Sequence, residues 1–264
     1  MTLLLHLSDT HFGTERPEVM EALVRLARSQ RPTAVIASGD ITQRARRSQF
    51  AAARRFIDRL GAPAIVIPGN HDIPLFNLPL RLLAPYAGFR RNFGPTLEPR
   101  QMFDRAWIAG VNTTRRWRHK HGEISAEQAD SAGRWLEGAP EGVLRVVVTH
   151  QPVAVSRQRD SVDLLRGGRQ AALRWAAAGV HLVLGGHIHL PYFLPLKRVW
   201  PEMTRPVWLA QAGTGVSRRT RPEAGNSVNL VRHLGRQGWQ LERWDHLQST
   251  RNFESCSVVP FDVQ

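Results

Sequence analysis

Side chains that can bind a metal ion follow several short apolar runs of the sequence. The run "LVLGGHIH" closes on two glycines and then presents His187 and His189, and the first run of the chain leads into "SDTH", with Asp9 and His11. In each pair the residues are two positions apart, which places both side chains on the same side of an extended segment. Two histidines alone make an incomplete metal site, so the other ligands must come from elsewhere in the chain.

Three further apolar runs end on residues of the same kind. "SGD" supplies Asp40, "GNHD" supplies Asn70, His71 and Asp72, and "VVVTH" supplies His150. Ligands of open α/β sheets bind at the carboxyl ends of the strands, so we expect all of these side chains to converge on one rim. Glycines beside them permit tight turns and a close approach of the backbone.

The combined set contains carboxylate, amide and imidazole groups but no sulfur, which suits Mn, Fe, Zn or Co. The candidate ligands are Asp9, His11, Asp40, Asn70, His150, His187 and His189. They are too many for one ion and suit two divalent ions that share a bridging carboxylate. Two ions ~3.5–4 Å apart clamp a phosphoryl group and turn a shared water into a nucleophile at neutral pH. Each motif alone has a structural alternative, such as a capped turn, but their joint occurrence at strand ends favours the metal site.

The elements that must position these residues alternate along the first two-thirds of the chain. Strands are expected over 2–8, 33–40, 62–70, 106–112, 143–150 and 181–185. Amphipathic helices are expected over 17–30, 48–60, 125–138 and 169–179. This order implies right-handed crossovers and parallel strands that are buried on both faces. Beyond Pro195 the helical pattern stops, and antiparallel strands are expected over 207–213, 226–233 and 238–245.

Composition places the chain among ordinary globular proteins. It has 264 residues, of which 42% are hydrophobic, and it reads as one domain over 1–264. Its single cysteine, Cys256, excludes an internal disulfide framework and a cysteine-based zinc site. The N-terminal "MTLLLHL" is too short for a signal peptide, and no run approaches the ~20 apolar residues of a membrane helix. These features predict a cytoplasmic protein without a membrane partner.

The formal charge of +14 raises the possibility of a nucleic-acid partner. Of 36 basic residues only Lys120 and Lys197 are lysine, so 34 are arginine, many of them in helical stretches. Solvated helix faces are the favoured interpretation, and a polyanion surface is the alternative.

The blocks "LSDTHFG", "SGDIT", "GNHD", "VTHQP" and "GGHIH" resemble, in order, the five signature blocks of calcineurin-like metallophosphoesterases. The resemblance covers about residues 3–190 and is nearest to the bacterial branch that includes class III cyclic-nucleotide phosphodiesterases. It implies a four-layer α/β/β/α sandwich of two mixed sheets, in which the later antiparallel strands complete the second sheet. The loops of this sequence do not match those of any one branch, so the resemblance does not identify the substrate.

The resemblance also implies roles for individual residues. One ion is held by Asp9, His11, Asp40 and His189, and the other by Asp40, Asn70, His150 and His187, with Asp40 as the bridge. His71 is the expected catalytic residue that is not a ligand, because an imidazole can donate a proton to the leaving oxygen near neutral pH. Asp72 either orients His71 or serves only to form a turn.

We expect substrate selection to depend on two segments that show neither the helical nor the strand pattern. Residues 73–105 and 153–168 each follow a strand end, and we expect cap or lid segments there. Asn112 ends a further strand, and Arg115 and Arg116 follow it. These three residues either bind an anionic part of the substrate or belong to an ordinary solvated loop.

The leading functional hypothesis is hydrolysis of a small phosphodiester, such as a cyclic nucleotide, by a metal-bridging hydroxide. A nuclease and a phosphomonoesterase are alternatives with the same chemistry. A non-catalytic scaffold is the rival from another class, because a fold does not imply a function. The metals, the substrate and the oligomeric state are left open by the sequence.

Overall fold

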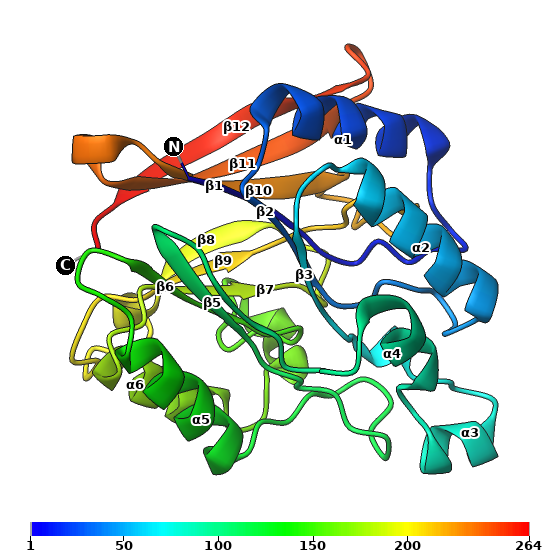
Figure 1. The fold of residues 1–264 in the computed structure, drawn as a ribbon, viewed down its shortest axis with the longest axis horizontal. Coiled ribbons are helices and arrows are strands. Elements are labelled where there is room, and N and C mark those ends of the chain that lie inside the picture. Colours follow the sequence, from blue (N-terminus) through cyan, green and yellow to red (C-terminus); the bar gives the residue numbers. More distant parts are fainter. Residues whose placement is uncertain (1, 264) are drawn as a thin grey trace.

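Two six-stranded β-sheets pack face to face in the computed structural model, which describes residues 2–263 (Figure 1). The first sheet has the order β12-β11-β10-β1-β2-β3 and the second β4-β5-β6-β7-β9-β8. Helices α1 and α2 cover the outer face of the first sheet, and α5 and α6 cover the outer face of the second (Figure 1). The expected four-layer α/β/β/α sandwich is therefore confirmed.

The elements have the following bounds. The first sheet contains β1 (Leu3–Leu7), β2 (Ala34–Ser38), β3 (Ala64–Ile67), β10 (Ser227–His233), β11 (Trp239–Leu247) and β12 (Asn252–Phe261). The second contains β4 (Arg100–Met102), β5 (Ala106–Gly110), β6 (Leu144–Val148), β7 (Leu182–Gly185), β8 (Tyr192–Pro195) and β9 (Trp208–Gln211). The helices are α1 (Pro17–Gln30), α2 (Arg47–Arg59), α3 (Leu78–Leu83), α4 (Ala87–Phe93), α5 (Ala126–Glu137) and α6 (Gly168–Ala177). None of the helices within residues 2–263 combines the length and apolarity needed to cross a bilayer.

Three apolar cores lie between the four layers. Residues such as Leu4 and Ile36 of the first sheet pack against Val146 and Leu184 of the second. Strands β1 and β2 are buried along their whole length, because the outer side chains of the first sheet pack under α1 and α2. The helices of the other outer layer pack on the second sheet around Trp175, whose indole N–H donates to the carbonyl of Ala129 in α5. Burial on both faces explains why the parallel strands read as continuous apolar runs.

Local sequence signals set the helix ends. Helix α1 begins at Pro17, which lacks the N–H that the first turn would leave unpaired, and it presents Val19, Leu23 and Leu26 to the core. Helix α5 begins with a capping box, in which the Ser125 hydroxyl accepts from the Gln128 N–H and the Gln128 side chain accepts from the Ser125 N–H. Both helices lie within one residue of the bounds expected from the sequence.

The C-terminal strands differ from the expectation. Of the three antiparallel strands that were expected beyond Pro195, only the first, β9, enters the second sheet. It lies parallel to β7 and antiparallel to β8. Strands β10 and β11 instead extend the first sheet from the open edge of β1, with Leu3 opposite Arg232. The expectation that the later antiparallel strands complete the second sheet is therefore wrong. Alternation indicates that a strand pairs, but it does not specify which sheet edge receives it.

Residues 73–105 contain more regular structure than expected. They form α3, α4 and β4, and β4 pairs with β5 at the edge of the second sheet. The buried Phe89 of α4 joins the core under α2, and its ring packs against Phe93. Helix α4 is thus part of the fold, whereas α3 lies at the margin of the molecule (Figure 1). That residues 73–105 and 153–168 form cap segments stays a prediction.

Candidate metal centre

The predicted ligands converge where the two sheets meet. Asp9 and Asp40 follow β1 and β2 of the first sheet, and His150 and His187 follow β6 and β7 of the second. The carboxyl ends of these strands meet along one rim, so residues far apart in sequence come within a few ångströms of one another. The residues form two main clusters that share one carboxylate.

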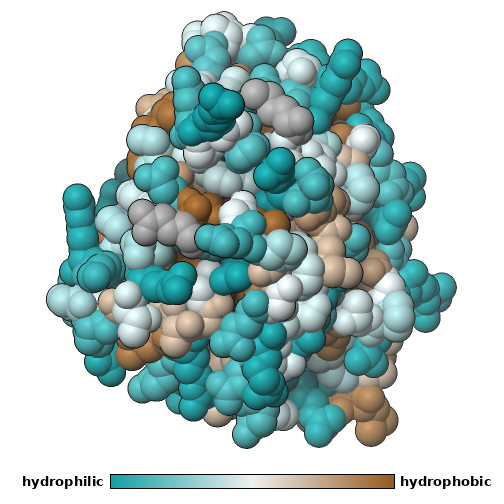
Figure 2. Space-filling view, turned by 60° about the vertical axis from the view of Figure 1, so that its left-hand side comes forward, coloured by the Kyte–Doolittle hydropathy of each residue, from teal (hydrophilic) through white to brown (hydrophobic). Residues whose placement is uncertain are grey.

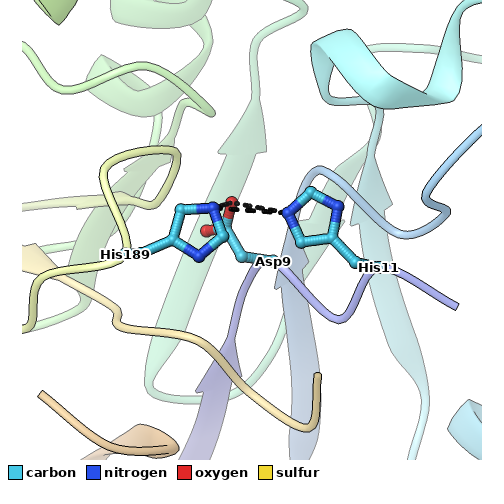
Figure 3. Close-up of side chains that lie close together, drawn as sticks. All are labelled: Asp9, His11 and His189. Atoms are coloured by element: carbon cyan, nitrogen blue, oxygen red, sulfur yellow. Dashed lines mark hydrogen bonds and ion pairs between the residues drawn. The ribbon is translucent and has the colours of Figure 1, made fainter. Parts of the chain in front are cut away.

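The first cluster contains Asp9, His11 and His189 (Figure 3). Asp9 Oδ1 lies 3.7 Å from His11 Nε2 and 3.4 Å from His189 Nε2, and the two imidazole nitrogens are 3.3 Å apart. The Thr214 hydroxyl lies 2.7 Å from His189 Nδ1 and so leaves Nε2 directed at the cluster. Asp9 Oδ1 is buried without a hydrogen-bond partner, which suits a ligand atom of a cation.

The second cluster contains Asp40, Asn70, His150 and His187. His150 Nε2 lies 3.3 Å from Asp40 Oδ1 and 3.3 Å from Asn70 Oδ1. The opposite nitrogen, Nδ1, lies 2.8 Å from the Ser38 carbonyl oxygen, which fixes the ring so that Nε2 points into the cluster. Both ring nitrogens of His187 are buried without a hydrogen-bond partner. Such orphaned buried nitrogens fit a site that completes its bonding with a metal ion.

Asp40 lies between the two clusters. Its Oδ1 faces His150, whereas its Oδ2 lies 3.6 Å from His11 Nε2. A backbone N–H from His71 donates to Oδ1 at 2.8 Å and helps to hold the carboxylate in this orientation. One oxygen is thus directed at each cluster.

The backbone around the ligands is not extended, contrary to the reasoning from the i, i+2 spacing. Asp9, His11, Asp40, His187 and His189 all have positive φ angles, between 41° and 74°. These left-handed conformations turn consecutive side chains in different directions, so His187 and His189 enter different clusters. A non-glycine residue in this region carries strain, and such strain is concentrated at functional sites.

Two glycines let the backbone approach the ligands closely. A side chain at Gly69 would collide with the backbone and the carboxylate of Asp40. A side chain at Gly186 would collide with Ser8 and with Asp9 Oδ2. The glycines beside these motifs therefore have the role in close approach that the sequence indicated.

His71 lies beside the shared carboxylate and faces the pocket. Its Nε2 is 4.0 Å from Asp40 Oδ2, and its ring lies edge-on to that of His11. Its Nδ1 lies 3.0 Å from the Gln43 carbonyl oxygen, an interaction that favours a proton on Nδ1. His71 also falls within ligand distance of His11 and Asp40, so its position alone is compatible with metal binding.

Asp72 makes different contacts from those expected of a residue that orients His71. One carboxylate oxygen accepts from the backbone N–H groups of Ile41 and Gly69, and the other accepts from the N–H and hydroxyl of Thr42. The His71 ring is instead positioned by Gln43. Asp72 thus joins the loop after β2 to the loop after β3.

Buried charges shift the pKa values within the centre. Burial lowers the pKa of His11 to about 3 and also lowers that of His187. Burial acts in the same direction on His150, but the carboxylates of Asp40 and Asp9 outweigh it and raise the pKa of His150 to about 9. Burial alone would raise the pKa of Asp40, yet the neighbouring histidines hold it well below its usual range. Asp40 Oδ1 and His150 Nε2, 3.3 Å apart, therefore form an ion pair within the centre.

A pocket of about 600 Å³ opens over the second cluster and the Asp40 carboxylate. Its lining includes Asp40, Asn70, His71, His187 and His189. It also includes His119 and Lys120 of the basic loop after β5, which the sequence placed near the rim, and four residues that the sequence did not single out, namely Arg44, Asp163, Arg219 and Arg221. Their loops have no periodic pattern, so only the three-dimensional path of the chain brings them to the site.

The three predicted substrate-binding residues lie outside this lining. The Asn112 carboxamide oxygen accepts from the N–H and hydroxyl of Thr114. Arg115 donates to the carbonyl of Asn112 and to Gln128, and Arg116 donates to the carbonyl of Leu82. These contacts tie the loop after β5 to its neighbours. Direct contact of Asn112, Arg115 and Arg116 with substrate stays a prediction.

Segment 153–168 supplies one residue to the pocket. Asp163 is buried, lies 2.7 Å from Lys120 Nζ and lies 3.7 Å from His187 Nε2. Burial acts to raise the pKa of this carboxyl, but the contacts with His187 and Lys120 lower it strongly. The segment thus places a carboxylate behind the second cluster.

Solved structures with this architecture include metal-dependent phosphatases. A purple acid phosphatase from yellow lupin seeds aligns with 99% of this chain, with a TM-score of 0.73 and 11% sequence identity. The chain spans 54% of the length of that phosphatase. A dimetal phosphatase from Danio rerio aligns with 100% of this chain and 99% of its own, with a TM-score of 0.68 and 12% identity. At these identities the likeness establishes the metallophosphoesterase fold.

Sequence comparison establishes the family. The family model for calcineurin-like phosphoesterases matches residues 2–191, so the chain belongs to this family. A curated relative, the glycerophosphodiester phosphodiesterase GpdQ of Enterobacter lignolyticus, is 29% identical over 210 residues, which cover 71% of this chain and 70% of the relative. The resemblance inferred from the five sequence blocks is therefore confirmed.

Proposed function

We propose that the protein is a phosphodiesterase that works with two divalent metal ions. The observation that carries this proposal is the placement of Asp40, whose two oxygens face two separate clusters of imidazole and carboxylate groups. The phosphodiesterase activity named for the relative supports a diester as the substrate.

The residues present fit such ions. In this proposal Asp9, His11 and His189 hold one ion, Asn70, His150 and His187 hold the other, and Asp40 contributes to both. The buried, unpartnered Asp9 Oδ1 and one of the two unpartnered ring nitrogens of His187 support this assignment. The donor set of oxygen and nitrogen suits Mn, Fe or Zn. When bound, the ions would supply Lewis acidity to the phosphoryl oxygens and a hydroxide nucleophile from a shared water.

We assign to His71 the role of donating a proton to the leaving group. The Gln43 carbonyl oxygen, 3.0 Å from Nδ1, orients the ring at the pocket wall, where Nε2 can donate a proton to the departing alkoxide. Asp72 is assigned a positioning role, because its carboxylate fixes the two loops that carry Asp40 and His71.

Cationic side chains on the pocket wall favour an anionic substrate. Arg44 and Arg219 line the pocket, and within residues 2–263 no carboxylate forms an ion pair with either. Arg219 donates instead to the Gln43 side chain at 3.0 Å. Two guanidinium groups in this position can bind phosphate oxygens. The same wall suits a nuclease, which we retain as the alternative.

Metal analysis combined with hydrolysis of bis(p-nitrophenyl) phosphate tests the proposal. We expect two ions per chain and faster turnover of this diester than of p-nitrophenyl phosphate. His121→Ala is the matched control, because His121 is an exposed histidine outside the pocket lining. Salt dependence separates the alternatives, since the affinity for a nucleic acid falls steeply with ionic strength. Two ions per chain without turnover of any ester would favour a scaffold.

A further inference from the structure

An apolar surface lies around α3, outside the cores of the molecule. We define the α3 patch as Phe76, Leu78, Leu80, Leu82, Leu83 and Trp117. Their exposed fractions range from 38% for Leu80 to 85% for Leu83. By contrast, the face in Figure 2 is largely hydrophilic, with apolar residues in small separate groups. A short helix that is apolar and exposed on most sides requires a binding partner to bury it.

Hydrogen bonds join the parts of the patch into one surface. Arg116 donates to the carbonyl of Leu82 at 2.6 Å, and the buried Arg81 donates to the carbonyl of Arg118 at 2.7 Å. These two contacts hold Trp117 beside α3. Phe76 packs under the guanidinium of Arg44, which also lines the pocket. The α3 patch therefore adjoins the mouth of the pocket.

The charge around the patch selects the kind of partner. The sequence contains no acidic residue between Asp72 and Glu98, and none between Asn112 and Glu123. The exposed arginines Arg44 and Arg116 contact residues of the patch. Two copies of such a face would bring like charges together, which disfavours a symmetric dimer. The α3 patch is complementary to a partner that has a negatively charged surface with an apolar layer directly below that surface.

We propose that the α3 patch docks on an anionic lipid bilayer, which replaces our expectation from the sequence that the protein has no membrane partner. Leucine, phenylalanine and tryptophan side chains enter the boundary between headgroups and acyl chains, and the arginines contact the headgroup phosphates. Because Arg44 belongs to both surfaces, docking brings the pocket mouth next to the membrane. The docking itself is independent of the proposed hydrolysis, so it can be tested without a substrate.

Sedimentation with lipid vesicles tests this proposal. We expect the protein to sediment with vesicles of phosphatidylcholine mixed with phosphatidylglycerol, and not with phosphatidylcholine alone. The double variant L82Q/L83Q should weaken binding by about tenfold or more, because two exposed leucines no longer enter the lipid. Trp117→Gln should weaken it less. Val258→Gln is the matched control, since Val258 is 51% exposed on β12, outside the patch.

Each alternative outcome overturns the proposal. Vesicle binding that is absent in the wild type, or unchanged in L82Q/L83Q, excludes docking through α3. A wild-type dimer in light scattering that becomes a monomer in L82Q/L83Q identifies a second copy as the occupant. The thermal unfolding midpoints of both variants, measured by circular dichroism, should equal that of the wild type. This equality shows that the variants are folded and does not depend on the proposed function.

Discussion

The two ligand clusters differ in charge and in protonation. The first combines Asp9 with the shared Asp40, so two carboxylates face His11 and His189. Among its candidate ligands the second has only Asp40, because Asn70 contributes a neutral amide oxygen beside His150, and the nearby Asp163 carboxylate is paired with Lys120. Burial keeps the pKa of His11 at about 3, whereas the carboxylates raise that of His150 to about 9. An ion at the second cluster must displace a proton, but His11 in the first is already neutral at pH 7.

From this difference we expect one site of the proposed centre to hold its ion firmly, while the other site exchanges its ion with the solution. We expect the first cluster to bind its ion more tightly, since an anionic ligand attracts a cation more strongly than an amide does. In the proposed centre the second ion would keep more of its positive charge and would be better suited to polarise a phosphoryl oxygen. The predictions below test this contrast.

Asp40→Asn should have the largest effect, because it removes the carboxylate that both clusters share. We expect both ions to be lost and hydrolysis of bis(p-nitrophenyl) phosphate to fall by about 10³-fold or more. Metal content per chain, measured by mass spectrometry of the purified protein, checks the first part. Retention of two ions would contradict the role of Asp40 as a bridge.

His71→Ala should separate catalysis from metal binding. Loss of the proton donor is expected to lower the rate by roughly 10²-fold or more, and most for diesters with poor leaving groups. Metal content should stay at two ions per chain. If this variant lost metal instead, His71 would belong to the ligands of the centre.

Asn70→Asp should reduce the difference between the clusters. An added carboxylate in the second cluster is expected to lower the Kd of the weaker ion about tenfold, which corresponds to 1.4 kcal/mol. Calorimetric titration of the metal-free protein measures both ions separately. The Kd of the ion at the first cluster should change little, because Asn70 contacts His150 and not His11.

The second ion should bind with release of a proton. Below pH 9 the raised pKa keeps His150 protonated in the metal-free protein, so the apparent affinity for the second ion should rise with pH up to about 9. The first ion should displace no proton from His11, whose lowered pKa of about 3 leaves it neutral. Calorimetry in buffers of different ionisation enthalpy counts these protons. Equal proton release from both steps would refute the contrast.

Asp72→Asn should have the smallest effect on catalysis and act mainly on stability. The amide cannot accept from all four donors that the carboxylate satisfies, which costs about 1–3 kcal/mol. We expect Tm to fall by roughly 2–10 °C in a thermal melt. Loss of metal from the second cluster should precede loss from the first, because Asp72 anchors the loop of Asn70.

The helices and parallel strands were predictable because buried positions carry apolar residues at a regular spacing in the sequence. Helix α1 carries its core residues at helical spacing, and its limits follow from Pro17 and the end of the apolar stripe. Strand β12 was missed because most of its side chains are exposed, so neither alternation nor an apolar run marks it. Helix α3 was missed for the opposite reason, since its leucines are apolar but not buried.

The convergence of the candidate ligands was predictable because each stands directly after a buried strand. Their grouping was not, since the positive φ angles of His187 and His189 are invisible in the spacing of the sequence. Pocket residues such as Arg44, Asp163 and Arg219 come from loops without periodicity. Their convergence depends on contacts between distant segments, for example Lys120 with Asp163.

The pairing of β1 with β10 has a consequence for how the chain is made. During translation β1 finds its parallel neighbour β2 within the first forty residues, but its other edge is covered only after residue 233 has left the ribosome. For most of synthesis the nascent protein therefore carries an open strand edge, a hazard for aggregation. Slowing elongation between residues 40 and 233 should therefore lower the yield of native protein more than slowing it before residue 40.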